Sequence, residues 1–232
     1  MNWETYLDEL AQSGVTLWPD GDDLLVEGQP EALTSAHLET LKTHKQDLLH
    51  FLRHATTQHP LSAGQQGLWF EHQMMPEGFA YNVSLSLRIH SVVEPALLAQ
   101  AFQQLVNRHP ALRTSFPVVE GQPIQRVHRY QEVILSVIDA TLWTEQEALE
   151  KVRASHELPL DLAQGPLFRL SLFTRNATDH ILLFTPHHLI CDGWSVWLLM
   201  DELRTSYTAI LADEPANLPA LRATYTLSLI HI

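Results

Sequence analysis

The chain has 232 residues, of which 45% are hydrophobic, and a formal net charge of −13, as expected for one or two globular domains. The acidic balance argues against nucleic-acid binding, which needs a basic face. No apolar run approaches the roughly 18 residues of a membrane span, and the acidic N-terminus does not resemble a signal peptide. A single cysteine, Cys191, cannot form an internal disulfide. We therefore expect a cytoplasmic protein without membrane association.

The first 55 residues predict a small acidic unit. Residues 1–56 hold ten Asp and Glu against three Lys and Arg. Apolar residues recur at helical spacing in 3–10, and two alternating segments, 15–18 and 23–27, flank the turn signal 19–22. Leucines at helical spacing follow Thr34, an expected N-cap, in a stripe broken near residue 43. The predicted order is helix, hairpin, helix, helix.

So small a unit has little core of its own. We expect it to pack on a partner, on a second copy of itself or, as an accessory cap, on the main domain. The open edges of a two-stranded hairpin accept a strand from another chain. The acidic hairpin suits a partner with basic residues, although a solvated acidic face gives the same pattern.

Residues 56–60 are polar, end in Pro60 and predict a linker. The pattern that follows alternates between helical and strand periods and predicts an α/β domain with a mixed sheet. Helices are expected at 62–69, 94–106, 144–156 and 194–211. Strands are expected at 81–89, 115–119, 124–128, 133–138, 167–175 and 180–186, the last two antiparallel.

The stretch from His187 to Gly193 lies between the last strand and the last helix. A histidine there can take up and return a proton near neutral pH. Asp192 could orient an imidazole or pair with an arginine elsewhere, and Gly193 permits a turn or a close approach to a ligand. The alternatives are a merely polar loop and a metal site. Adjacent histidines point apart on an extended backbone, and no Cys/His cluster supports a metal.

The sequence His-His-Leu-Ile-Cys-Asp-Gly at 187–193 resembles the HHxxxDG signature of condensation domains of nonribosomal peptide synthetases, in the chloramphenicol acetyltransferase-like superfamily. The resemblance implies that His188 is the catalytic residue, either removing the amine proton or positioning the amine. His187 and Asp192 would be structural. Gly193 would leave room beside the thioester, with its amide facing the oxyanion. A cyclisation subtype is disfavoured, because its signature has Asp in place of both histidines.

Three further stretches match the same family in its order. Residues 62–70 resemble the first motif, SxAQxRxWxL, although Gly67 replaces its usual basic or long residue. Residues 108–116 match the second motif, RHxxLRTxF, and residues 158–169 resemble PFDLxxGPLxR. In this family an arginine of the second motif is associated with the signature aspartate. The resemblance therefore implies an ion pair of Asp192 with Arg113, or with Arg108 as second choice.

Residues 1–55 resemble the TubC-type N-terminal docking domain of synthetase subunits. The matching elements are Leu10–Trp18, Gly21–Leu24, Leu33–Thr34 and Leu48–Leu52. In that family the domain binds the C-terminal tail of the upstream subunit by strand addition to the hairpin. Here this implies a docking strand formed by Leu24, Leu25 and Val26.

The resemblance also implies how the chain fits into a larger protein. Residues 61–226 would form the first of two lobes, and residues 227–232 read as a non-native tail. The parent activity would be amide-bond formation between substrates held on phosphopantetheine arms of donor and acceptor carrier domains. No directly bound cofactor and no metal are implied.

Three other functions remain open. They are a non-catalytic docking fragment, a stand-alone acyltransferase that uses an acyl-coenzyme A donor, and an enzyme with a Cys191 nucleophile.

Overall fold

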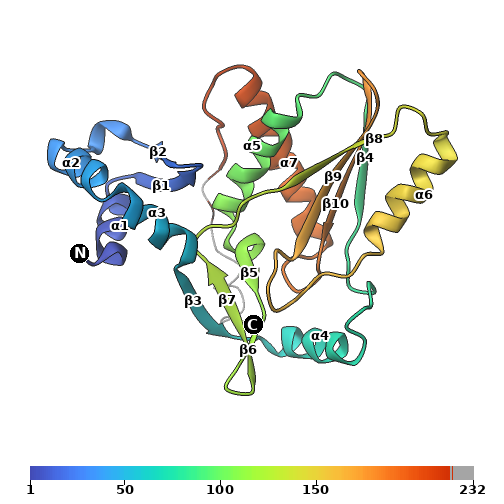
Figure 1. Cartoon of the computed structure of the whole chain (residues 1–232), viewed down its shortest axis with the longest axis horizontal. Coiled ribbons are helices and arrows are strands. Elements are labelled where there is room, and N and C mark those ends of the chain that lie inside the picture. The colour runs from blue at the N-terminus through green and yellow to red at the C-terminus, as the bar shows by residue number, and fades with distance from the viewer. Residues whose placement is uncertain (220, 222–232) are drawn as a thin grey trace. The chain divides into compact units, whose positions relative to one another are not determined.

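The computed structural model describes residues 1–219 and 221, which form two compact units. The N-terminal unit contains Met1–Thr57 and His128–Gln131, and the main unit contains the rest. Figure 1 shows the helices and strands of both. The expected non-native tail at 227–232 lies outside the described residues.

The N-terminal unit has the expected order of helix, hairpin, helix and helix. Its elements are α1 (Trp3–Gln12), β1 (Val15–Asp20), β2 (Asp23–Gly28), a short 3-10 helix (Pro30–Ala32), α2 (Ser35–Thr43) and α3 (Lys45–His54). The side chain of Asn2 caps α1, and Thr34 begins α2 with a capping box, as its position predicts. The core lies between the helices and the hairpin, and its buried members include Leu10, Leu17, Leu48 and Leu52.

The central sheet of the main unit is mixed, as expected. Its strands run in the order β4 (Leu85–Ile89), β10 (Asp179–Pro186), β9 (Phe168–Asn176) and β8 (Leu135–Asp139). The pairs β4–β10 and β10–β9 are antiparallel, whereas β8 and β9 are parallel. A parallel pair needs a crossover connection, and α6 (Glu145–His156) lies between β8 and β9 in the chain.

Helices cover both faces of this sheet (Figure 1). Leu182 and Phe184 of β10 pack in one cluster with residues of α5 (Pro95–Arg108) and α7 (Gly193–Leu211). Ile181 and Leu183 face the other way and pack with residues of α6. Because both faces are buried, β10 is a continuous apolar run instead of an alternating one.

A second sheet, most of whose residues belong to the main unit, and one further helix complete the described structure. The sheet has the order β3 (Thr56–Pro60), β7 (Gln122–His128) and β5 (Thr114–Ser115), with β6 (Val118–Val119) also paired to β7. Residues 56–60, predicted as a linker, form β3, and the division between the two units falls within them, after Thr57. Two threonines favour a strand, and Pro60 is tolerated because β3 is at the end of the sheet order.

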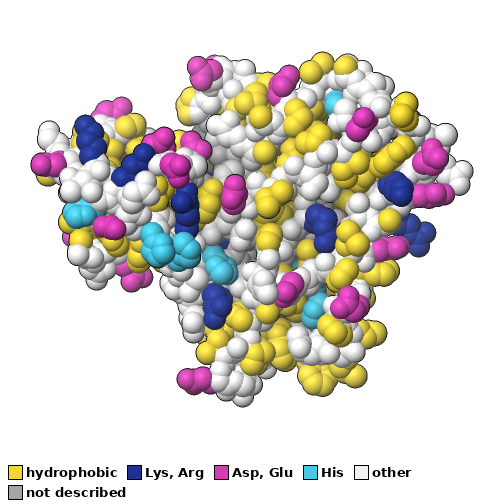
Figure 2. All heavy atoms as spheres, in the orientation of Figure 1, with side chains coloured by type: hydrophobic (Ala, Val, Ile, Leu, Met, Phe, Trp, Pro, Cys, Tyr) yellow, Lys and Arg dark blue, Asp and Glu magenta, His cyan; other side chains and the backbone are white. Residues whose placement is uncertain are grey.

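The helix α4 (Ala63–Met74) begins at the capping box of Ser62, as predicted. It leaves Phe70, Met74 and Met75, just past its end, exposed. Figure 2 shows hydrophobic side chains gathered over this part of the surface. The strand predicted at 81–89 is shorter, because only Leu85–Ile89 pairs continuously.

Candidate functional site

The signature begins directly after Pro186, the last residue of β10. His187 still pairs as a bridge, and His188 begins a turn that is closed by the Ile190 N–H donating to the His187 carbonyl at 3.1 Å. The His187 N–H donates to the carbonyl of Leu167 at 2.8 Å, and the His188 N–H donates to the carbonyl of Tyr81 at 2.8 Å. An isolated bridge joins Asn82 to His187. At the start of this turn the two imidazoles separate: His187 is buried, whereas His188 is exposed.

The imidazole of His187 is held inside the main unit. It is 2% exposed, and its Nδ1 accepts the Leu189 N–H at 3.1 Å. Its ring lies edge-on to that of His72, with centroids 5.7 Å apart. Burial, together with the nearby His72 and His188, lowers the pKa of His187 to about 4. His187 is therefore neutral near pH 7 and supports the loop through Nδ1.

Asp192 begins α7 as its N-cap residue. Its Oδ1 accepts both the backbone N–H and the hydroxyl of Ser195, each at 2.7 Å. These hydrogen bonds, with a smaller contribution from His188, hold the pKa of the Asp192 carboxyl below its ordinary value. The carboxylate is thus ionised near pH 7 and lies at the positive end of the helix dipole.

Arg113 and Arg108, the two residues predicted to pair with Asp192, both make contacts at the end of α5. Arg113 is buried, and its guanidinium donates to the carbonyls of Val106 at 2.9 Å and Asn107 at 3.1 Å. These carbonyls are in the last turn of α5, where backbone acceptors lack partners within the helix. Arg113 therefore satisfies the end of α5, a role for which the sequence has no local signal.

Arg108 forms an ion pair with Glu202 of α7. Its Nε lies 3.2 Å from Glu202 Oε2, and His109 Nε2 lies 2.7 Å from the same oxygen. Glu202 is 4% exposed. Burial alone would raise its pKa, but the contacts with His109 and Arg108 lower the pKa on balance. The first two residues of the second motif thus join the end of α5 to the middle of α7.

Gln65 of the first motif supports the loop from α4. This side chain is 2% exposed, and its Nε2 lies 3.3 Å from both the Leu189 carbonyl and Gln125 Oε1. Its Oε1 accepts the Ser62 N–H at 3.1 Å, which closes the capping box. The sequence pattern indicated the helix cap, but the contact with Leu189 spans 124 positions and had no local signal.

The start of α7 is open beside the loop. Gly193 is its first residue, and a Cβ built there meets no atom within 4 Å. Its φ is not in the left-handed region, so the turn itself does not require glycine. Trp194 and Trp197 are 81% and 63% exposed. This surface leaves space for a bound molecule beside the first amides of the helix.

Cys191 has the surroundings of a structural cysteine. It is 2% exposed, and its Sγ lies 3.8 Å from the carbonyl oxygen of His187. Burial and the charge of Asp192 raise the pKa of the thiol to about 12. A nucleophilic cysteine needs the opposite shift.

Residues 1–219 and 221 contain neither a metal-binding cluster nor a membrane-spanning helix. There, no group of three His, Cys, Asp or Glu side chains is arranged to hold a metal ion. In that same part of the chain, no helix has both the length and the apolar character to cross a membrane.

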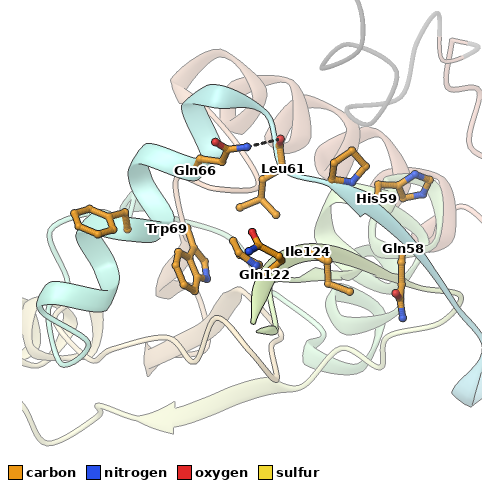
Figure 3. A pocket seen from close by; sticks show the side chains of 10 residues that line it. Gln58, His59, Leu61, Gln66, Trp69, Gln122 and Ile124 are labelled. Carbon is orange, nitrogen blue, oxygen red and sulfur yellow. Dashed lines mark hydrogen bonds between the residues drawn. The ribbon is translucent and has the colours of Figure 1, made fainter. Parts of the chain in front are cut away.

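A separate groove of about 660 Å³ lies between β3, α4 and β7. Figure 3 shows Trp69 and Leu61 beside it, with the amide of Gln66 donating to the Leu61 carbonyl at 3.3 Å. Gln58 and His59 line its other side. None of residues 187–193 lines this groove, so it is distinct from the signature loop.

Two family models match the chain, one for each part. The model for the condensation domain matches residues 55–227, and the model for the TubC N-terminal docking domain matches residues 4–54. One of the linear gramicidin synthase proteins of Brevibacillus parabrevis is 35% identical over 170 residues, covering 72% of this chain and 2% of that protein. Bacitracin synthase 2 of Bacillus licheniformis is 27% identical over 212 residues, covering 85% of this chain and 8% of that protein.

Solved structures give the same relationship. The starter condensation domain of rhizomide synthetase matches with a TM-score of 0.69 and 25% identity, over 75% of this chain and 43% of that one. The first condensation domain of the calcium-dependent antibiotic synthetase, in complex with a substrate analogue, matches with a TM-score of 0.64 and 26% identity. That match covers 71% of this chain and 40% of the other. The chain thus spans less than half of each solved domain and a few per cent of these synthases.

Proposed function

Because the chain belongs to the condensation-domain family of nonribosomal peptide synthetases, with a TubC-type docking domain before that domain, we propose that it serves amide-bond formation in a larger synthetase subunit. The α-amino group of an aminoacyl thioester attacks the carbonyl of a donor thioester. A new C–N bond forms, the C–S bond breaks, the amine loses a proton and the thiolate gains one. Both substrates are carried on phosphopantetheine arms of carrier domains, as the relationship to synthetases supports.

The single observation that carries this proposal is the different burial of the two histidines. His188 is exposed on backbone fixed by the Tyr81 carbonyl, whereas His187 is buried and neutral. His188 is therefore free to receive the amine proton or to position the amine by a hydrogen bond. A second imidazole does not compete for that proton, because the Nδ1 of His187 already accepts the Leu189 N–H.

The start of α7 supports the remaining role, stabilisation of the oxyanion. Backbone amides at a helix N-terminus have no partners within the helix, and the helix dipole favours negative charge there. Gly193 has open space beside it. We assign its amide to the thioester oxygen, which becomes negative as the tetrahedral intermediate forms. Asp192 and Gln65 act indirectly, by fixing the helix start and the loop.

The N-terminal unit serves to recruit the upstream subunit. We assign β2, through Leu24, Leu25 and Val26, as the strand that pairs with the C-terminal tail of that subunit. The match of the docking-domain family to residues 4–54 and the two-stranded hairpin of Figure 1 support this assignment.

The test is His188→Ala in the full-length synthetase protein that contains this chain, supplied with donor and acceptor aminoacyl groups on carrier domains. Intact-protein mass spectrometry of the acceptor carrier measures the rate of peptide transfer. We expect a loss of about 100-fold or more, the usual contribution of a proton-transferring side chain. His90→Ala is the matched control, because His90 is also exposed but follows β4 at Ile89. Retention of more than a tenth of the rate by His188→Ala would refute the assigned role.

A further inference from the structure

The outer edge of β2 has no strand beside it in the described part of the chain. The sheet contains only β1 and β2, paired antiparallel from Val15–Gly28 to Asp20–Asp23. Among residues 1–219 and 221, the backbone of 24–27 is in no hydrogen bond besides those of the hairpin. An unpaired edge of this kind is a template for another strand.

Pro19 determines which backbone groups of β2 point to that edge. Pairs in an antiparallel ladder alternate between those that exchange two hydrogen bonds and those that exchange none. Pro19 is paired with Leu24 and has no N–H, so this pair belongs to the second kind. Leu24, and by alternation Val26, therefore direct their N–H and C=O groups outward. An added strand would bond to these two residues.

The side chains of β2 divide between two faces. Leu24 and Val26 pack against the core of the N-terminal unit. Asp23, Leu25 and Glu27 point to the other face, where Leu25 is 48% exposed. This outer row presents one apolar side chain with a carboxylate two positions away on each side.

The two carboxylates differ in how far they are already neutralised. Asp23 makes an ion pair with Lys45 of α3, and both side chains are substantially exposed. Glu27 accepts the Nε1–H of Trp18 at 2.6 Å. The indole is a neutral donor, and no cation is paired with Glu27 among residues 1–219 and 221, whereas Asp23 is paired with Lys45. Glu27 is therefore the stronger attraction for a cationic side chain on an added strand.

We infer that the tail that binds β2 has five consecutive residues of the form basic–x–apolar–x–basic, with the apolar residue beside Leu25 and the basic residues beside Asp23 and Glu27. This inference rests on the docking function proposed above. It adds the position of each charge and the two hydrogen-bonding residues of β2. The pattern is the same in both directions, so it applies whether the tail runs parallel or antiparallel to β2.

The probe is the fluorescein-labelled peptide Thr-Lys-Val-Leu-Val-Lys-Thr, titrated into the whole chain and followed by fluorescence polarisation. Three further peptides carry Glu in place of the first Lys, the second Lys or both. We expect the doubly reversed peptide to bind about tenfold more weakly, since cross-strand charge pairs have modest individual effects. Amide chemical shifts of the ¹⁵N-labelled chain report whether Leu24 and Val26 are contacted.

Glu27→Lys tests the position of the charge. It should weaken the Lys peptide and strengthen one of the two singly reversed peptides, and which one reveals the direction of the added strand. The control is Glu31→Lys, which makes the same change of net charge on an exposed residue outside the hairpin. Glu27→Gln, which retains an acceptor for Trp18, should give about half the effect and guards against misfolding of Glu27→Lys.

The outcomes separate this inference from the docking function. If the amide chemical shifts of Leu24 and Val26 change but the Lys and Glu peptides bind equally well, the inference is overturned and strand addition to β2 still holds. Equal effects of Glu27→Lys on both singly reversed peptides, or an equal effect of Glu31→Lys, show long-range attraction only and also overturn it. If no peptide perturbs Leu24 or Val26, strand addition to β2 fails and the inference fails with it.

Discussion

Replacing Asp192 with alanine tests whether this residue acts by capping α7 beside the signature loop. The substitution removes an oxygen that accepts the N–H and the hydroxyl of Ser195. Loss of an N-cap side chain costs about 1 kcal/mol, and loss of a negative charge at a helix N-terminus costs about 0.5 kcal/mol more. We therefore expect Asp192→Ala to lower the free energy of unfolding of the main unit by about 1.5 kcal/mol. Asp192→Asn keeps the acceptor and should lower it by only about 0.5 kcal/mol.

The pH dependence of this difference follows from the lowered pKa of Asp192. A depressed pKa means that the folded state binds the proton more weakly than the unfolded state. The stabilisation by the carboxylate is therefore complete above the ordinary value of 3.8 and is lost as pH falls through the lower folded-state pKa. The stability of the parent chain should approach that of Asp192→Asn only in strong acid.

Urea denaturation at pH 7, followed by tryptophan fluorescence and near-ultraviolet circular dichroism, measures these free energies. The control is Asp201→Ala, because Asp201 is exposed in the interior of the same helix and pairs with exposed Arg204. We expect the control to change stability by less than about 0.5 kcal/mol. If Asp192→Asn is as unstable as Asp192→Ala, the charge and not the cap is essential. That result would support the predicted ionic partner of Asp192.

Two other predictions concern buried groups of the main unit. Glu202→Ala should lower the free energy of unfolding of this unit by about 3 kcal/mol in urea denaturation, because Arg108 and His109 lose their partner in a largely buried site. A loss below about 1 kcal/mol would contradict this prediction. The control is Glu150→Ala, because Glu150 is exposed. Cys191 should resist iodoacetamide at pH 7.5 in the folded chain and react in urea, as measured by intact mass, because its thiol is buried with a pKa of about 12. Rapid alkylation of Cys191 in the folded chain would contradict this prediction and support a nucleophilic role for Cys191.

The sequence predicted local features of the fold well, because local patterns determine them. Alternation and turn residues located the hairpin at 15–28, and the capping pattern located the starts of α2 and α4. The strand β3 at residues 56–60 was not predicted, because its pairing with β7 is a long-range event that no local composition reveals. The same reason explains why β4 is shorter than the strand predicted at 81–89. The residues before Leu85 do not continue the ladder with β10, although Asn82 forms an isolated bridge with His187.

The candidate site was predicted in part. The signature motif located His187, His188 and Asp192, whose assigned roles at the site remain predictions. The resemblance did not reveal the contacts of Arg113 and Gln65, because those contacts form between segments that meet only in the folded unit. Arg113 serves the carbonyls at the end of α5, and Gln65 reaches the Leu189 carbonyl from another helix. The Gln65 contact joins segments far apart in the chain, so its motif alone does not reveal it.

The order of strands in the central sheet has a consequence for synthesis of the protein. The elements β8, α6, β9 and β10 are consecutive in the chain and can assemble by short closures, whereas β4 pairs with β10 across the interval from Leu87 to Leu182. Closing so long an interval is slow. While the ribosome synthesises those residues, β4 is unpaired and can pair with the wrong strand. The signature loop, residues 187–193, directly follows β10. We therefore expect this loop to fold late, after nearly all the residues that contact it have been synthesised.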